Sequence, residues 1–144
     1  MKTSKQIVFL IGIVFLISCC NSTSKSPERN IDRVKIKYVD FFSIMTFLPI
    51  DCANFEKEFK NSYNEFEIED KSAINELLSI LNSLDTISNA YINTRGKIEI
   101  YSKEDTLLYC VGDLTLSFQE VSYKTPQSLI DFIEKYDNPR ATYK

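Results

Sequence analysis

The sequence predicts an α+β domain in which an antiparallel sheet of about four strands carries two main helices packed on one face. Apolar and polar residues alternate along 33–40 and along much of 97–119, which is typical of strands with one buried face. Apolar residues recur at helical spacing along 71–84 and 126–136, which is typical of amphipathic helices. One-sided strands and helices bury their apolar surfaces together when they pack in two layers.

The first predicted strand, residues 33–40, is apolar on one face and basic on the other. Residues 63–68 alternate over a shorter distance and predict a further short strand. Pro49 lies between the two and cannot donate to a strand ladder, so it ends strand pairing there. The apolar face of the first strand consists of Val34, Ile36 and Tyr38, and the basic face of Lys35 and Lys37.

Residues 90–123 predict the rest of the antiparallel sheet. The polar residues 102–105 predict one turn, and Gly112-Asp113 predicts a second. Around these turns the chain alternates between apolar and polar side chains, so that one face points toward the helices. The inward residues are Ile98, Ile100, Leu114, Leu116 and Phe118.

Each predicted helix begins at a residue that can cap it. Asp51 caps a short helix, Asp70 or Ser72 caps the helix along 71–84, and Thr125 precedes Pro126 at the start of the last. The apolar residues of the short helix are Cys52, Phe55 and Phe59. Those of the second are Ile74, Leu77, Leu78, Leu81 and Leu84, and those of the last are Leu129, Ile130, Ile133 and Tyr136.

The N-terminal residues predict a signal peptide that is removed from the mature protein. Lys2 and Lys5 precede an uncharged apolar run that ends at Ile17 and is too short to span a bilayer. A small residue, Ser18, then stands before Cys19. The predicted organisation is a signal peptide (1–18), a polar tether (19–30), one α+β domain (31–138) and a C-terminal tail (139–144).

The segment Leu16-Ile17-Ser18-Cys19 resembles the lipobox of bacterial lipoproteins. The resemblance implies that Cys19 is acylated and becomes the first residue of a cell-envelope protein, which two or three acyl chains hold on its membrane. No Asp follows Cys19, and this favours the outer membrane, with the domain facing the periplasm. The alternative is an ordinary secretory signal cut near Ser18. Size, lipobox and an Asn/Lys/Ile-rich composition also resemble the small uncharacterised lipoproteins of the Bacteroidota.

Composition excludes several function classes. After removal of residues 1–18, 15 basic and 20 acidic residues remain, so nucleic acid, which needs clustered Lys and Arg, is not an expected partner. The chain has no histidine, which excludes Ser-His-Asp and Cys-His catalysis and an HExxH zinc site. Two glycines in the mature chain leave no glycine-rich phosphate loop. We expect no cofactor, no metal and no catalysis.

Cys52 and Cys110 both lie on predicted apolar faces. In an exported protein they can form a disulfide, which would join the first short helix to the central hairpin. The alternative is two buried thiols that act as small apolar side chains. The sequence alone leaves both open, because it does not give the distance between the two Cα atoms.

Two polar features have a functional and a structural interpretation. Glu65, Glu67 and Glu69 alternate on one strand face, where carboxylates could bind Ca²⁺, although a solvated face is the favoured interpretation. Arg95, in the segment 93–96, could contact an anion or a partner, whereas the structural interpretation is a turn in which it bonds carbonyls or a carboxylate.

The outward face of the sheet is the candidate partner-binding surface, because mixed charge with tyrosine is typical of protein interfaces. A merely solvated face is the alternative. The residues of this candidate partner-binding surface are Lys35, Lys37, Lys97, Glu99, Tyr101, Thr115, Ser117 and Gln119.

We therefore expect a lipid-anchored, non-catalytic binding or structural module whose partners are the membrane, through its lipid, and another envelope protein. The second hypothesis is a periplasmic inhibitor or immunity-type protein directed against an enzyme or toxin, and its acidic surface would favour a basic partner. A carboxylate-based hydrolase is a third hypothesis, but no motif places its two carboxylates.

Overall fold

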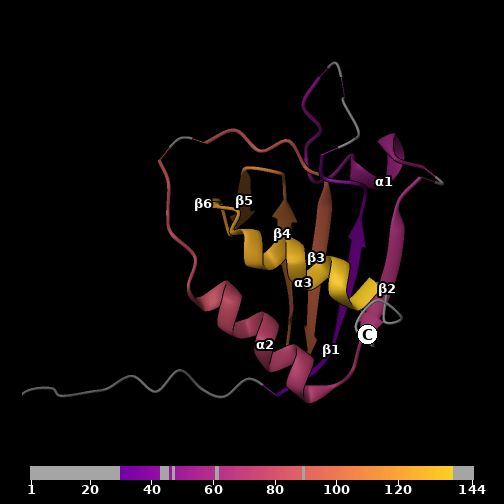
Figure 1. Cartoon of the computed structure of the whole chain (residues 1–144), viewed down its shortest axis with the longest axis vertical. Helices are drawn as coiled ribbons and strands as arrows, with labels where there is room; N and C mark the ends of the chain where they lie inside the picture. The colour runs from indigo at the N-terminus through magenta and orange to yellow at the C-terminus, as the bar shows by residue number, and fades with distance from the viewer. Residues whose placement is uncertain (1–29, 43–45, 47, 61, 89, 138–144) are drawn as a thin grey trace, which may run out of the picture.

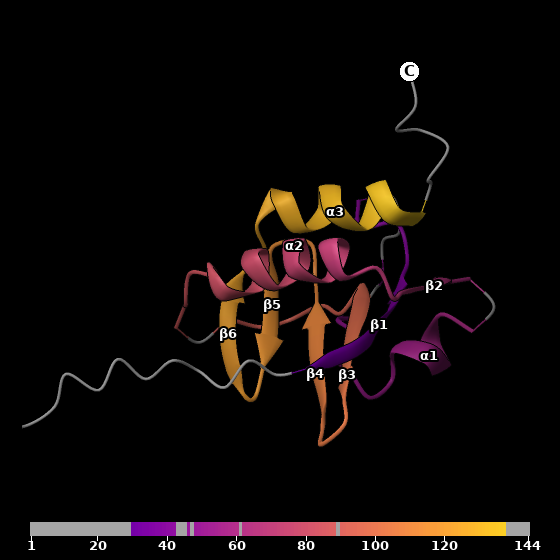
Figure 2. The ribbon, with the colours of Figure 1, turned by 90° about the horizontal axis from the view of Figure 1, so that it is seen from below.

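The computed structural model describes residues 30–42, 46, 48–60, 62–88 and 90–137. They form two layers, in which helices α2 and α3 lie on one face of an antiparallel sheet (Figures 1 and 2). The predicted signal peptide, the acylated Cys19, nearly all of the tether and the C-terminal tail lie outside the described residues. No helix of the described part is long and apolar enough to cross a membrane.

The sheet has six strands rather than about four, and the described residues contain three helices. The spatial order is β2-β1-β3-β4-β5-β6, and every neighbouring pair is antiparallel. The elements are β1 (Ile31–Tyr38), α1 (Phe55–Glu58), β2 (Asn64–Ile68), α2 (Lys71–Asn82), β3 (Gly96–Ser102), β4 (Thr106–Val111), β5 (Thr115–Phe118), β6 (Val121–Lys124) and α3 (Gln127–Asp137).

The last hairpin accounts for one of the strands that the sequence did not predict. Gln119 and Glu120 form its two-residue turn with φ angles of 49° and 67°, a left-handed conformation that usually selects Gly or Asn. Because neither residue is a turn former, the sequence gives no sign that the chain reverses there. Leu114, expected on the inner face, lies before β5 and is 73% exposed.

The main hydrophobic core fills the space between the sheet and the two longer helices. Side chains at 0–2% exposure come from both layers, and burying each contributes about 1.5–3 kcal/mol. The sheet supplies Val34, Ile36, Ile98, Ile100, Val111 and Leu116, and the helices supply Ile74, Leu77, Leu129, Ile130, Phe132 and Ile133.

The three predicted caps have different outcomes. Asp51 does not cap α1, because that helix begins later, with Asn54 at its N-cap and no side-chain cap hydrogen bond. Asp70 caps α2, and its carboxylate accepts a hydrogen bond from the Ala73 amide at 2.8 Å. The Thr125 hydroxyl, predicted to cap α3, instead donates to the Gly112 carbonyl at 3.0 Å. This bond ties the start of α3 to the turn between β4 and β5.

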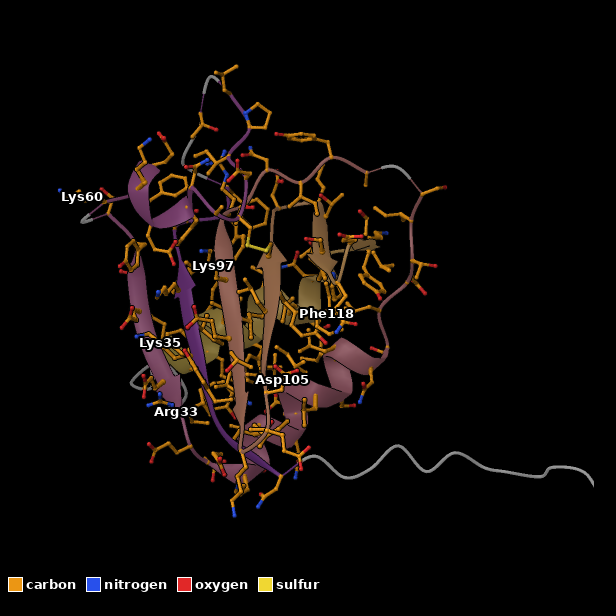
Figure 3. The ribbon with its side chains drawn as sticks, turned by 180° about the vertical axis from the view of Figure 1, so that it is seen from behind. Arg33, Lys35, Lys60, Lys97, Asp105 and Phe118 are labelled. Atoms are coloured by element: carbon orange, nitrogen blue, oxygen red, sulfur yellow. A yellow bond between two sulfur atoms is a disulfide. The ribbon has the colours of Figure 1, made fainter. Side chains whose placement is uncertain are left out.

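A second, smaller core lies on the opposite face of the sheet, under α1. Its buried members are Val39, Ile50, Phe55 and Phe59. Residues 48–55 therefore lie over one end of the sheet, where the Cys52–Cys110 disulfide joins them to it. The rest of that face has no helix over it in Figure 3.

Candidate functional site

The sheet face opposite α2 and α3 carries nearly all of the predicted partner-binding residues. Strand register places Lys37 beside Lys97 and Lys35 beside Glu99, with Ser117 further along the same face. Figure 3 looks onto this face, where Lys35 and Lys97 are labelled. Gln119 is separated from the others, because it lies in the β5–β6 turn.

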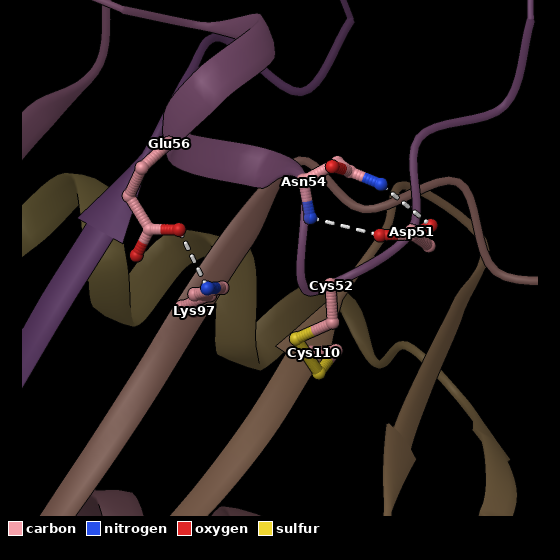
Figure 4. The surroundings of a disulfide bond; sticks show 6 residues. All are labelled: Asp51, Cys52, Asn54, Glu56, Lys97 and Cys110. Atoms are coloured by element: carbon pink, nitrogen blue, oxygen red, sulfur yellow. Dashed lines mark hydrogen bonds and ion pairs between the residues drawn. A yellow bond between two sulfur atoms is a disulfide. The ribbon is translucent and has the colours of Figure 1, made fainter.

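Glu56 of α1 binds the two lysines at the upper end of this face. Its carboxylate lies 2.6 Å from Lys97 Nζ and 3.1 Å from Lys37 Nζ, and Figure 4 shows α1 placing it over β3. Burial would raise the pKa of Glu56, but hydrogen bonds from Lys97, from its own backbone amide and from Lys37 lower it. Lys97 is only 8% exposed, so the Glu56 carboxylate compensates a positive charge that has little contact with water.

A second set of ion pairs covers the lower part of the face. Lys35 Nζ lies 2.7 Å from Glu65, and Arg33 lies 3.5 Å from Glu67. The hydrogen bond to Glu65 raises the pKa of Lys35, against the smaller opposing effect of burial. The Tyr101 hydroxyl donates to Glu99 at 2.6 Å, and this bond raises the pKa of Tyr101.

The face is therefore electrically balanced by its own residues. Arg33, Lys35, Lys37 and Lys97 meet Glu56, Glu65, Glu67 and Glu99. The pairing also accounts for two members of the predicted acidic cluster, and Glu69 lies beyond the end of β2. Within the described residues, no group of three or more Cys, Asp or Glu side chains could hold a metal ion.

Cys52 and Cys110 form a disulfide, with their Cα atoms 5.7 Å apart. The bond joins the segment before α1 to β4 (Figure 4). Beside it, Asp51 accepts hydrogen bonds from the backbone and side-chain nitrogens of Asn54, at 2.8 and 2.9 Å. The covalent bond and this turn fix the entry to α1 on the sheet.

Arg95 is buried and serves the packing of this region. One of its terminal nitrogens donates to Thr46 Oγ1 at 3.3 Å, and its guanidinium carbon lies 5.7 Å from the centre of the Phe59 ring. The other terminal nitrogen, Nη1, has no hydrogen-bond acceptor among the described residues. The Arg95 side chain is only 5% exposed, so it is not accessible to a partner that binds at the surface.

Three loop segments meet at the end of the sheet where β1 and β4 finish. The Ile50 amide donates to Asn93 Oδ1 at 3.0 Å, and Thr115 Oγ1 donates to the Tyr91 carbonyl at 3.0 Å. A Cβ on Gly112 would lie 2.7 Å from the Asn93 carbonyl oxygen, so only glycine permits this approach. The segments around residues 48–50, 90–95 and 112–115 thus form one continuous surface.

Four large apolar side chains are exposed at this end, and no other large apolar side chain of the described residues is as exposed. They are Phe42 (65%), Leu48 (77%), Tyr91 (67%) and Leu114 (73%), and we call this surface the apolar end. Sequence reasoning missed it, because its members lie in separate loops and share no periodic pattern.

A cavity of about 490 Å³ opens beside Leu48 and carries acidic groups. We call it the acidic cavity. It is lined by Thr46, Leu48, Pro49, Ile50, Asp51, Asn54 and Glu58. Hydrogen bonds from the backbone and side chain of Asn54 lower the pKa of Asp51, so the cavity carries negative charge at neutral pH.

A groove of similar volume, about 480 Å³, lies between α2 and α3. The polar side chains at its rim bind one another. Lys135 Nζ lies 2.9 Å from Glu76, and the Tyr136 hydroxyl donates to Glu76 at 3.1 Å. Those bonds lower the pKa of Glu76. The groove follows from the packing of two helices.

No protein-family model matches the chain, and no curated protein or solved structure is similar to it. The functional interpretation therefore depends on this chain's own geometry. That geometry combines a charge-balanced sheet face with an apolar end next to an acidic cavity. Exposed aromatic and aliphatic side chains on a fixed frame are typical of surfaces that bind macromolecules.

Proposed function

We propose that the protein is a lipid-anchored, non-catalytic binding module of the cell envelope that contacts its partner through the apolar end. The observation that supports this proposal is the concentration of Phe42, Leu48, Tyr91 and Leu114 at one end of the domain. Contact between clustered apolar side chains and water is unfavourable in free energy. A partner that covers these side chains removes this contact, and that stabilises the complex.

The position of the apolar end agrees with anchoring at Cys19. Ile31 begins β1 at one end of the sheet and pairs with Ser102, whereas Tyr38 ends β1 beside Gly96 at the other. The apolar end belongs to the second of these, because the loop segments that carry it are hydrogen-bonded to one another there. The polar tether therefore joins the domain at the end opposite the apolar end, which leaves the apolar end open to a partner.

The disulfide supports the same proposal. It fixes the segment before α1, so the loops that form the apolar end lose little conformational freedom when a partner binds. The sheet face, which the sequence favoured for binding, is the weaker candidate, because its lysines and glutamates already bind one another.

The proposal is tested by affinity purification of the full, anchored chain from its own membranes. Mass spectrometry would compare the wild type with Leu114→Asp at the apolar end and with Val121→Asp as the matched control. Val121 is 43% exposed and lies beside the turn of the β5–β6 hairpin, at the other end of that hairpin from Leu114. We expect Leu114→Asp alone to lose a co-purified envelope protein, and equal recovery with all three forms would contradict the proposal.

A periplasmic inhibitor or immunity-type protein is the second candidate function. The observation that favours it is the excess of acidic residues in the mature chain, 20 against 15 basic ones, since this charge speeds docking to a basic enzyme or toxin. The same purification distinguishes the candidates, because this one requires the recovered partner to be an enzyme or toxin that loses activity when bound.

A further inference from the structure

The acidic cavity and the apolar end adjoin, and together they restrict the chemistry of what can bind. Leu48 belongs to both, since it lines the cavity and is 77% exposed. Pro49 and Ile50 supply an apolar wall beside it, and Asp51 and Glu58 supply carboxylates. An apolar wall with an acidic margin fits the aliphatic stem and the cationic head of a lysine or arginine side chain.

The carboxylates near this surface differ from those of the sheet face in making no direct ion pair, although Lys97 acts on Asp51 from a longer distance. Asp51, Glu58 and Asp113 form no ion pair with any described residue, whereas Glu56, Glu65 and Glu67 each do. Backbone bonds hold two of the three in place, because Asp51 accepts from the Asn54 amide and Asp113 from the Leu114 amide at 3.0 Å. Lys57 belongs to α1 and Lys60 follows it, but neither lysine lines the cavity.

From this charge complementarity we infer that the apolar end docks a basic protein segment, with one of its arginine or lysine side chains in the acidic cavity between Asp51 and Glu58. The inference rests on the proposed function and specifies its partner. Phe42, Tyr91 and Leu114 then cover the apolar residues that flank the basic side chain. Aromatic anchors beside a charge pair that is shielded from water are typical of the centre of a protein interface.

A membrane is the competing occupant, since exposed Phe, Leu and Tyr side chains also enter lipid. The charges oppose it, because Asp51, Glu58 and Asp113 would face the anionic head groups that draw basic segments to membranes.

The test uses the full chain in phosphatidylcholine nanodiscs. The sequence contains no tryptophan, so Leu114→Trp gives a single fluorescent reporter at the apolar end. Val121→Trp gives the matched reporter at the other end of the β5–β6 hairpin, beside its turn. The probe is a pentapeptide of three leucines separated by two arginines. Its control is the same peptide with citrulline, the uncharged analogue, at both arginine positions.

We expect the arginine peptide to shift the emission of the Leu114→Trp reporter to saturation and to leave that of Val121→Trp unchanged. The citrulline peptide should bind at least fivefold more weakly. Adding Glu58→Gln to the Leu114→Trp chain should weaken the binding of the arginine peptide at least threefold. The control is Glu104→Gln, which removes an exposed carboxylate at the opposite end of the sheet and should leave the binding of the peptide unchanged. Thermal melts of both variants establish that they remain folded.

Equal binding of the two peptides, equal response of the two reporters, or full binding by the Glu58→Gln chain would overturn the inference. So would the absence of saturable binding. In that case, recovery of a partner that Leu114→Asp abolishes would still support the proposed function. Quenching of the Leu114→Trp reporter by brominated lipids in anionic nanodiscs would assign the apolar end to the membrane and overturn both proposals.

Discussion

At the scale of single residues, Glu56 contributes most to the arrangement of the sheet face. It binds Lys37 and Lys97 from a different element, and Lys97 has little contact with water. We expect Glu56→Gln to lower the free energy of unfolding at pH 7 by roughly 1.5 kcal/mol, measured in urea melts, because it leaves Lys97 without a carboxylate and Lys37 with only Glu99, 4.0 Å away. The matched control is Glu67→Gln in an exposed pair, which should lose less than about 0.5 kcal/mol.

The same residue predicts a pH dependence. The folded state lowers the pKa of Glu56 below its ordinary value of 4.5, so its stabilising contribution is complete above that pH. It is lost as the pH falls through the lower, folded-state pKa. The difference in unfolding free energy between the wild type and Glu56→Gln should therefore shrink between pH 5 and pH 3. A difference that stayed constant or grew on acidification would show that the ion pair is not its source.

The sequence predicted single residues unevenly. Alternation placed Lys35, Lys37, Lys97 and Glu99 on one face correctly, because side chains in a strand alternate whatever the strand pairs with. It could not reveal Glu56 as their common partner, because that contact joins residues 19 and 41 positions apart. Arg95 was assigned to a turn, yet it is buried against Phe59 from another element.

At the scale of elements, the β5–β6 turn stores removable strain. Gln119 and Glu120 both have positive φ angles, a conformation that costs most residues about 1 kcal/mol or more and costs glycine little. We expect Gln119→Asn with Glu120→Gly to raise the free energy of unfolding by about 1 kcal/mol. Lys103→Gly is the control, because residue 103 has no positive φ, and a similar gain there would rule out strain relief.

The disulfide should be the largest single stabiliser of the region around α1. It closes a loop with a sequence separation of 58 residues, for which chain entropy gives at most about 4 kcal/mol. We expect Cys52→Ser with Cys110→Ser to lose between about 2 and 4 kcal/mol in urea melts. A loss below about 0.5 kcal/mol would mean that the closed loop does not constrain the unfolded chain.

Helix α2 allows a test of its orientation. Leu77 has no exposed surface, whereas Leu78 is only partly buried beside the core. We expect Leu77→Ala to cost roughly 2–5 kcal/mol and Leu78→Ala clearly less. The reverse order, observed in urea melts, would mean that α2 is rotated about its axis. The apolar stripe predicted the helix but not which of two adjacent leucines faces inward, because tertiary packing decides that.

At the scale of the whole molecule, the sequence predicted the α+β class, the antiparallel pairing and the packing of the two longer helices. These three features follow from the spacing of apolar residues along each strand and helix, which can be read from short stretches of sequence. The number of strands did not follow, because Gln119-Glu120 is an unmarked turn that hides β6. The apolar end did not follow either, because it depends on three loops that meet only in the folded chain.

Anchoring is a prediction at the same scale. We expect a clickable fatty acid to label the wild type and Cys20→Ser, and not Cys19→Ser, because Ser18 and Leu16 place Cys19 at the end of the lipobox-like segment. Gel fluorescence of immunoprecipitated protein measures the labelling. Equal labelling of Cys19→Ser and the wild type would contradict the assignment of the lipid to Cys19.

The central claim is that a partner contacts the apolar end, and photo-crosslinking in intact envelopes tests it most directly. A benzophenone amino acid would replace Leu114 in one strain and Val121 in another, at exposed positions at opposite ends of the β5–β6 hairpin. The account predicts one dominant protein adduct from position 114 and none from position 121. The same adduct from both positions, or an adduct from position 121 alone, would contradict it.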